Sequence, residues 1–191
     1  MRKMKTLFKR EFIKKGNRTI GIIVLNEVED GCEWALNGVG TMSSKFDGTC
    51  CLVQGGELYK RFDYKKGRNL PSNAIPCQDA ADKITGHFPH WVKCSEDNPA
   101  DKWHLKAFKQ VPHRDDGTYE LCGEHFNGNK HRLKCDIFFR HGTQQIFDYE
   151  LELTFEGIKD YLNNTWCEGI VFKHPDGTMC KIKRTDFGFD W

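Results

Sequence analysis

Short stretches of this chain alternate between hydrophobic and polar residues, and turn-forming residues separate the stretches. The alternation in Thr19 to Glu27 predicts a β-strand. Two further stretches, Thr49 to Gln54 and Glu57 to Phe62, flank the pair Gly55-Gly56. A two-glycine turn between such stretches predicts a β-hairpin, so the first half of the chain is expected to form sheet.

The second half of the chain adds one helix to this pattern. Thr154 is a suitable N-cap, and Phe155, Ile158 and Leu162 recur on one face of a helix over Thr154 to Leu162. Strands are predicted at Tyr119 to Glu124, Lys134 to Phe139, Glu168 to Lys173 and Thr178 to Lys183, the last two joined by the turn Pro175-Asp176-Gly177.

One long segment, Asn69 to Pro112, is rich in Pro, His and Trp and has little periodicity, so it is predicted to be irregular. The remaining pattern predicts an α+β fold dominated by antiparallel strands. At 191 residues and 22.2 kDa, the chain fits one domain spanning residues 1–191 with room for a hydrophobic core.

Composition places this domain in the cytoplasm. The mean hydropathy is −0.66, and the longest apolar run, near Ile20 to Leu25, is too short to cross a membrane. The basic N-terminus lacks the apolar stretch of a signal peptide. The nine cysteines are an odd number and include the adjacent pair Cys50 and Cys51, which favours reduced thiols over a disulfide framework.

The net charge of +2 does not indicate a nucleic-acid binder, but the basic residues are grouped. Ordinary solvated charge explains any one group, whereas three groups flanking the motifs below favour a phosphate-binding face. The groups are an opening stretch from Arg2 to Arg18, then Lys60, Arg61, Lys65, Lys66 and Arg68, and finally Lys181, Lys183 and Arg184.

Two motifs carry candidate chemistry. The first is Lys45-x-Asp47-Gly48, which chance would produce in roughly one chain of this length in twenty or thirty. It leads directly into the first predicted hairpin, which places the lysine at a strand edge, and Gly48 permits a tight turn.

The second motif joins Glu168-Gly169 to Lys181-x-Lys183 across the second hairpin. Residues two apart in a strand point to the same face, so Lys181 and Lys183 are expected to project together, and the hairpin brings Glu168 close to them. Such a group is either a surface salt-bridge ladder, which contributes little, or a wall that binds metal and phosphate.

The order of these motifs resembles that of the lysine nucleotidyltransferases, the superfamily of polynucleotide ligases and capping enzymes. The small ATP-dependent 5′-3′ RNA ligases are the closer resemblance. It rests on KFDGTCC (45–51), YELCGEHFNGN (119–129), RHG (140–142) and EGIVFKHPDGTMCKIKRTDFGFDW (168–191), and weakly on GHFPHWVK (86–93).

This resemblance implies an antiparallel-sheet-rich, ATP-grasp-like adenylation domain. Many polynucleotide ligases carry a further domain, such as an oligonucleotide-binding fold, after the Lys-x-Lys motif. Only Arg184 to Trp191 follow that motif here, so no appended oligonucleotide-binding fold is expected. Lys45 would attack the α-phosphorus of ATP, and the adenylyl group would pass to an RNA 5′-phosphate before a 3′-hydroxyl displaces AMP. Each step is a phosphoryl-type transfer, in which catalysis is chiefly positioning and charge stabilisation.

The resemblance also assigns roles to individual residues. Lys45, Lys181, Lys183 and Glu168 would be catalytic, with the two later lysines on the α-phosphate. The ATP-binding set adds Asp47, Gly48, Arg61 and Glu120, and Mg²⁺ or Mn²⁺ would be held by Glu168 and Glu120. Glu124 stays open as an alternative to Glu120, and Phe138 or Phe139 is a candidate for stacking on adenine.

The expected partners are RNA ends, bound by a monomer with modest, salt-sensitive affinity, with a partner protein as a further source of RNA affinity. A DNA ligase and a capping-type nucleotidyltransferase are the rival enzymes. Outside enzymes, the rivals are an RNA-binding protein and a zinc-binding module. The zinc hypothesis rests on Cys77, His87, His90 and Cys94, whose spacing lacks a paired Cys-x₂-Cys.

Overall fold

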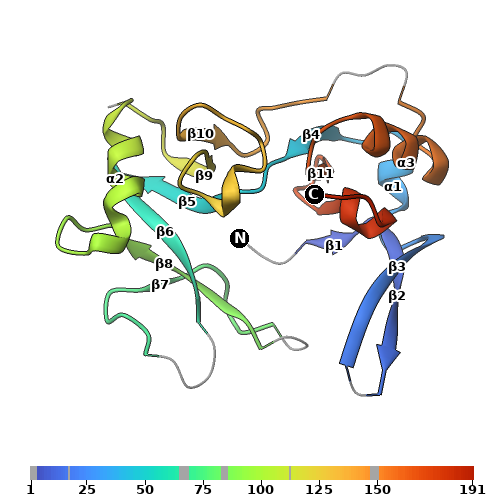
Figure 1. Ribbon diagram of the computed structural model, residues 1–191, viewed down its shortest axis with the longest axis horizontal. Helices are drawn as coiled ribbons and strands as arrows, with labels where there is room; N and C mark the ends of the chain where they lie inside the picture. Colours follow the sequence, from blue (N-terminus) through green and yellow to red (C-terminus); the bar gives the residue numbers. More distant parts are fainter. Residues whose placement is uncertain (1–3, 17, 65–68, 83–85, 112, 147–150) are drawn as a thin grey trace. The chain divides into compact units, whose positions relative to one another are not determined.

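A computed structural model of the chain describes residues 4–16, 18–64, 69–82, 86–111, 113–146 and 151–191 (Figure 1). These residues form two compact units. Unit 1 comprises Asp47–His141, and unit 2 comprises Met4–Phe46 and Gly142–Trp191. Both contain helices and mainly antiparallel sheet, so the class is α+β. The single domain over 1–191 and the nucleotidyltransferase fold stay predictions.

Unit 1 is built on a six-stranded antiparallel sheet with the order β10-β9-β5-β6-β8-β7. The predicted hairpin is confirmed, because Gly55 and Gly56 have φ values of 58° and 76° between β5 and β6. The strands are β5 (Thr49–Gln54), β6 (Glu57–Tyr64), β7 (Ile75–Pro76), β8 (Phe88–Lys93), β9 (Gly117–Cys122) and β10 (Ile137–Arg140).

One face of this sheet forms the core of unit 1. Alternate residues of β5 and β9, namely Cys51, Val53, Tyr119 and Leu121, are buried there. The helix α2 (Lys102–Lys109), which follows the 3-10 turn η1 (Pro99–Asp101), packs against this core through Ala107 and its neighbouring aromatic residues. The intervening residues of β5 and β9 therefore lie on the opposite face.

The prediction of irregular structure over residues 69–112 is wrong for β7, β8, η1 and α2, and its residues 83–85 and 112 lie outside the described ranges. β8 pairs along its length with β6, although Pro89 lies within it. Pro89 is tolerated because β7 supplies only a two-residue partner on the other side of β8. In α2, Trp103 and Ala107 are four residues apart and face the core, but polar residues between them obscure the helical period.

Unit 2 contains a four-stranded sheet with the order β1-β12-β11-β4, in which β1 runs parallel to β12 and the other neighbours are antiparallel. A separate hairpin of β2 and β3 forms the long blue ribbon of Figure 1. The elements are β1 (Lys5–Thr6), β2 (Phe8–Lys15), β3 (Arg18–Val28), α1 (Glu33–Leu36), β4 (Thr41–Lys45), α3 (Phe155–Asn164), β11 (Gly169–Lys173), β12 (Met179–Lys183) and η3 (Arg184–Phe187).

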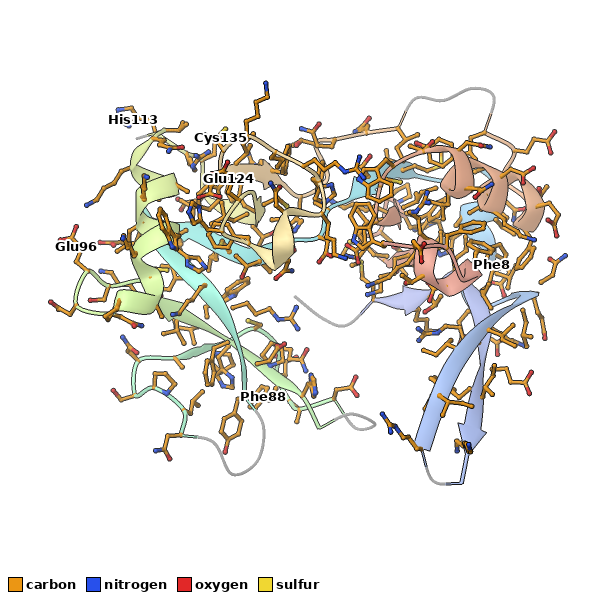
Figure 2. All side chains as sticks on the ribbon, in the orientation of Figure 1. Phe8, Phe88, Glu96, His113, Glu124 and Cys135 are labelled. Carbon is orange, nitrogen blue, oxygen red and sulfur yellow. The ribbon has the colours of Figure 1, made fainter. Side chains whose placement is uncertain are left out.

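The core of unit 2 lies between its sheet and α3. Ile170, Ile182, Ile158 and Leu162 are fully buried. Phe8, labelled in Figure 2, joins this core and packs edge-on against the ring of Phe155 at 5.0 Å. The predicted helix is confirmed with its cap, since the Thr154 hydroxyl accepts a hydrogen bond from the Gly157 N–H at 3.1 Å.

Most predicted strands are confirmed to within a few residues. The predicted Tyr119 to Glu124 strand ends two residues earlier, and β10 is shorter than predicted. Five of the described strands, β1, β2, β4, β7 and β8, were not predicted. Among the basic residues singled out in the sequence, Arg2, Lys3, Lys65, Lys66 and Arg68 lie outside the described residues.

All nine cysteines carry free thiols in this structure, as expected. None of the helices in the described ranges has the length and apolar character needed to cross a membrane.

Candidate active site

The strand register of unit 2 brings Lys45, Glu168 and Lys183 to one end of three neighbouring strands. Lys45 is the last residue of β4 and lies opposite Gly169 of β11. Lys183, the last residue of β12, lies opposite Gly169 on the other side. Glu168 directly precedes β11, so its side chain has a lysine from each neighbouring strand beside it.

The Glu168 carboxylate is paired with both lysines. Its Oε2 accepts a hydrogen bond from Lys45 Nζ, and its Oε1 forms an ion pair with Lys183 Nζ at 2.6 Å. Only 3% of Glu168 is exposed, whereas the two lysine side chains are 17% and 34% exposed. Glu168 is therefore an almost buried carboxylate whose lysine partners reach toward solvent.

Lys181 completes what we term the lysine cluster: Lys45, Glu168, Lys181 and Lys183. It lies two residues before Lys183 and so projects from the same face of β12. Burial, reinforced by the charges of Lys45 and Lys183, lowers the pKa of Lys181 to about 8. With three lysines and one carboxylate, the cluster has an excess of positive charge that an anion would relieve.

The backbone around the cluster is closely packed. A Cβ atom at Gly169 would lie 2.1 Å from the Ile182 carbonyl oxygen, so only glycine allows β11 and β12 to approach this closely. Beyond β12, the Asp186 carboxylate accepts a hydrogen bond from the Lys183 N–H at 2.9 Å. The Arg184 N–H donates to the Glu168 carbonyl at 3.0 Å, which fixes the residue that carries the central carboxylate.

The remaining residues of the first motif belong to unit 1. The Gly48 N–H donates to Glu120 Oε1 at 3.1 Å, and the Asp47 N–H donates to His131 Nε2 at 2.9 Å. The backbone bends at Gly48, and Gly48 is not in a left-handed conformation. Glycine is required there because a Cβ would lie 2.2 Å from the carbonyl oxygen of Leu121 in β9.

Glu120 and its alternative, Glu124, lie in different environments. Glu120 is partly buried on β9 beside Gly48, whereas Glu124 is exposed on the loop after β9, where Figure 2 labels it. Arg61 lies on β6 in the same unit, and its charge acts on Cys50, the strand neighbour of Glu120. Glu120 and Arg61 thus share unit 1, and the lysine cluster lies in unit 2.

The two candidate stacking residues differ in their surroundings. Phe138 is buried in the core of unit 1, where its ring is 6.0 Å from that of Tyr119. Phe139 is partly exposed and pairs with Glu120 across β10 and β9. Phe139 is therefore the one that shares a sheet face with Glu120.

The zinc-type ligands in the structure are not the ones that the sequence suggested. His90 is buried with its Nδ1 at 2.8 Å from the Phe88 carbonyl, and Cys94 is buried in the core. A different group, Cys50, Glu120 and His141, has ligand atoms within 4.8 Å of one another in the part of the chain that the structure describes. Sequence reasoning missed it because the three residues are far apart in the chain.

A hollow of about 180 Å³ lies at the beginning of β4, at the opposite end of that strand from Lys45. Its lining is mainly apolar and includes Val39, Met42 and Phe172. No lysine of the cluster contributes to it, so this hollow lacks the positive charge that a phosphate group needs.

Comparison with known proteins connects the chain with RNA ligases, at a distance. One relative is RNA ligase 1 from Pongo abelii, which is 26% identical over 162 residues, covering 66% of this chain and 47% of that protein. The chain thus spans about half the length of this relative. No protein-family model matches the sequence.

Proposed function

We propose that this protein is an ATP-dependent RNA ligase in which Lys45 forms a covalent lysyl-AMP. The observation that carries the proposal is the lysine cluster, a buried carboxylate held between Lys45 and Lys183 with Lys181 beside them. The distant similarity to RNA ligase 1 supports RNA as the recipient of the adenylyl group.

The cluster has the groups that lysine adenylylation requires. Lys45 Nζ must lose a proton before it can attack, and the Glu168 carboxylate is in hydrogen-bond contact to accept one. The attack forms an N–P bond to the α-phosphorus and breaks the P–O bond to pyrophosphate. Lys181 and Lys183 would stabilise the negative charge that develops on the α-phosphate.

Lys181 is suited to this role by its low pKa. With a pKa of about 8, Lys181 is mostly protonated at pH 7. Its positive charge is nevertheless unfavourable in the folded protein, because it is partly buried beside two other lysines. A bound phosphate would offset that cost. The ammonium group therefore binds an anion more favourably than a solvated lysine would.

The surroundings of Glu168 fit a hydrated Mg²⁺ or Mn²⁺ that is bound through water and not by direct coordination. Both carboxylate oxygens of Glu168 are already paired with lysines. Magnesium that is bound by one carboxylate and by substrate phosphates usually keeps several of its water ligands. Glu168 would hold the ion through water, and the ion would supply positive charge to the phosphates. Glu120, in unit 1, stays a prediction as the second metal-binding residue.

The other residues of the predicted nucleotide site also stay predictions. Asp47, Gly48, Arg61 and Glu120 belong to unit 1, where Gly48 and Glu120 are hydrogen-bonded to one another. Their contact with ATP is proposed from the resemblance of the motifs. Phe139, on the sheet face of Glu120, is the preferred candidate for stacking on adenine.

The test is covalent labelling of the purified protein. Incubation with α-labelled ATP and Mg²⁺ should label the protein, and addition of RNA with a 5′-phosphate should transfer the label to the RNA. The Lys45→Ala variant should take up no label, whereas Lys173→Ala, at an exposed lysine of β11, should be labelled normally. Labelling by GTP in place of ATP would favour a capping-type enzyme, and transfer to DNA ends alone would favour a DNA ligase.

A further inference from the structure

Three neighbouring strands of unit 1 place different ligand types on one face of the sheet. Cys50 of β5 is the direct cross-strand partner of Glu120 of β9. His141 follows β10, and its N–H donates to the Thr118 carbonyl at 3.1 Å, which continues the pairing of β10 with β9. Because Thr118 and Glu120 are two residues apart on one strand, all of these side chains share a face.

The candidate ligand atoms of Cys50, Glu120 and His141 lie close to one another. His141 Nε2 is 3.1 Å from Glu120 Oε2, and the Cys50 sulfur lies within 4.8 Å of both ligand groups. Tetrahedral coordination at zinc bond lengths requires separations of about 3.3 Å between N and O, and about 3.6 Å from S to either. Small side-chain movements would therefore close these three atoms around one ion.

Two further contacts hold the ligands in place. His141 Nδ1 lies 3.0 Å from the Thr118 hydroxyl, so donation to this hydroxyl leaves the Nε2 lone pair facing Glu120. Glu120 Oε1 is held by the Gly48 N–H, which leaves Oε2 directed at His141. Metal-binding histidines and carboxylates are commonly oriented by such neighbours.

We propose that Cys50, Glu120 and His141 bind a Zn²⁺ ion, with three protein ligands and one position open. Thiolate, imidazole and carboxylate together suit zinc better than magnesium, which prefers oxygen ligands alone. The His141 and Glu120 side chains are 31% and 16% exposed, so an ion can reach them from solvent. Glu120 is shared with the predicted nucleotide site, but no residue of the lysine cluster contributes a ligand, so the inference does not depend on formation of lysyl-AMP.

Binding of Zn²⁺ at this site would change the protonation state of Cys50. Burial, with the nearby Glu120 charge, raises the pKa of the Cys50 thiol to about 12, so the thiol without metal is protonated and unreactive. Binding of Zn²⁺ forms the S–Zn bond and releases the thiol proton to solvent, with no change in oxidation state.

The test is titration of the reduced, full-length protein with Co²⁺, followed by displacement with Zn²⁺. Binding should produce a thiolate-to-cobalt charge-transfer band, and Zn²⁺ should remove it with a stoichiometry of one ion per chain. Cys50→Ser should abolish the band, and His141→Ala should weaken Zn²⁺ binding at least tenfold. Thr118→Val should weaken it about 10- to 100-fold, because it removes only the group that orients His141.

Two controls separate this site from other thiols and from the ligase proposal. Cys135→Ser, at the exposed cysteine labelled in Figure 2, should bind Zn²⁺ normally. Lys45→Ala should also bind Zn²⁺ normally, even though it is expected to lose adenylylation. The proposal is overturned if no charge-transfer band forms, or if the band and the Zn²⁺ affinity persist in Cys50→Ser. An equal loss in Cys135→Ser would likewise overturn it.

Discussion

At the residue scale, the lysine cluster contains favourable ion pairs of Glu168 and one unfavourable positive charge, that of Lys181. Glu168 forms ion pairs with both Lys45 and Lys183. Lys181 has no such contact with Glu168, and its lowered pKa means that the fold disfavours its charged form. A site that binds an anion is expected to contain a cationic residue whose charge destabilises the fold when no anion is bound.

The first prediction concerns the stability cost of Lys181. Its folded pKa of about 8 lies below the ordinary 10.5, so the unfolded chain binds more protons between these pH values and wild-type stability rises with pH through that window. Lys181→Met should therefore raise the free energy of unfolding by about 1–3 kcal/mol at pH 7. The gain should shrink by pH 10, as measured by denaturant unfolding at both pH values.

A matched control is Lys173→Met, which replaces an exposed lysine at the far end of β11. It should change the stability little at either pH. A loss of stability in Lys181→Met, or a gain that does not depend on pH, would contradict the stated cost of the buried charge.

A second residue-scale prediction concerns Glu168. Glu168→Gln keeps the size and one hydrogen-bond acceptor. It removes the charge that is paired with Lys45 and Lys183, and with it the proposed proton acceptor for Lys45. The rate of lysyl-AMP formation should fall about 100-fold or more, measured by single-turnover labelling. Glu156→Gln, at an exposed glutamate of α3, should keep the wild-type rate; near-normal labelling of Glu168→Gln would remove Glu168 from the mechanism.

At the scale of elements, the cluster depends on the close approach of β11 to β12. The Gly169→Ala substitution places a methyl group 2.1 Å from the Ile182 carbonyl, so the strands must separate. We expect a loss of about 2 kcal/mol or more in the free energy of unfolding, together with loss of labelling. Thermal unfolding monitored by circular dichroism measures the first effect.

The comparison variant is Gly21→Ala on β3, where the added methyl would meet only the end of the Ile13 side chain at 3.3 Å. It should be much less destabilising than Gly169→Ala. If the two variants were equally stable, close strand packing would not be the reason for a glycine after Glu168.

Elements also show what could be predicted from sequence. The hairpin that ends in Lys181 and Lys183 was predictable because Pro175-Asp176-Gly177 fixes its turn, and strand alternation then places both lysines on one face. β4 was missed because Thr41 to Lys45 is polar and partly exposed, yet its pairing with β11 is what brings Lys45 to Glu168. Only long-range pairing reveals such a strand.

The ligand group of unit 1 was unpredictable for the same reason. Cys50, Glu120 and His141 come from three strands, and no local spacing connects them. In contrast, the segment from Cys77 to Cys94 offered metal-ligating residues close together in sequence, and its Cys94 is a core residue. Proximity in sequence was a poor guide because a sheet brings distant residues together and turns near ones to opposite faces.

At the scale of the whole molecule, the chain passes from unit 2 to unit 1 between Phe46 and Asp47, inside the first motif. The lysine that is proposed to be adenylylated thus belongs to one unit, and the Asp47 and Gly48 that follow it belong to the other. Because the net charge is only +2, the proposed affinity for RNA would come from local basic groups.

This charge distribution gives a prediction about salt. Binding to single-stranded RNA should weaken with a slope of about −0.7 per phosphate contacted in a plot of log K against log salt concentration. Transfer of the adenylyl group to RNA should therefore fall more steeply between 50 and 200 mM salt, roughly, than formation of lysyl-AMP does. Equal salt dependence of the two steps would show that RNA binding does not limit transfer.

The central claim is that Lys45 itself carries the adenylyl group. The direct measurement is peptide mapping by mass spectrometry after incubation of the wild-type protein with ATP and Mg²⁺. We expect one adenylyl group per chain, located on Lys45, and none on any lysine of the Lys45→Ala variant. Adenylylation of Lys181 or Lys183 in place of Lys45, or an unmodified protein that still joins RNA ends, would contradict it.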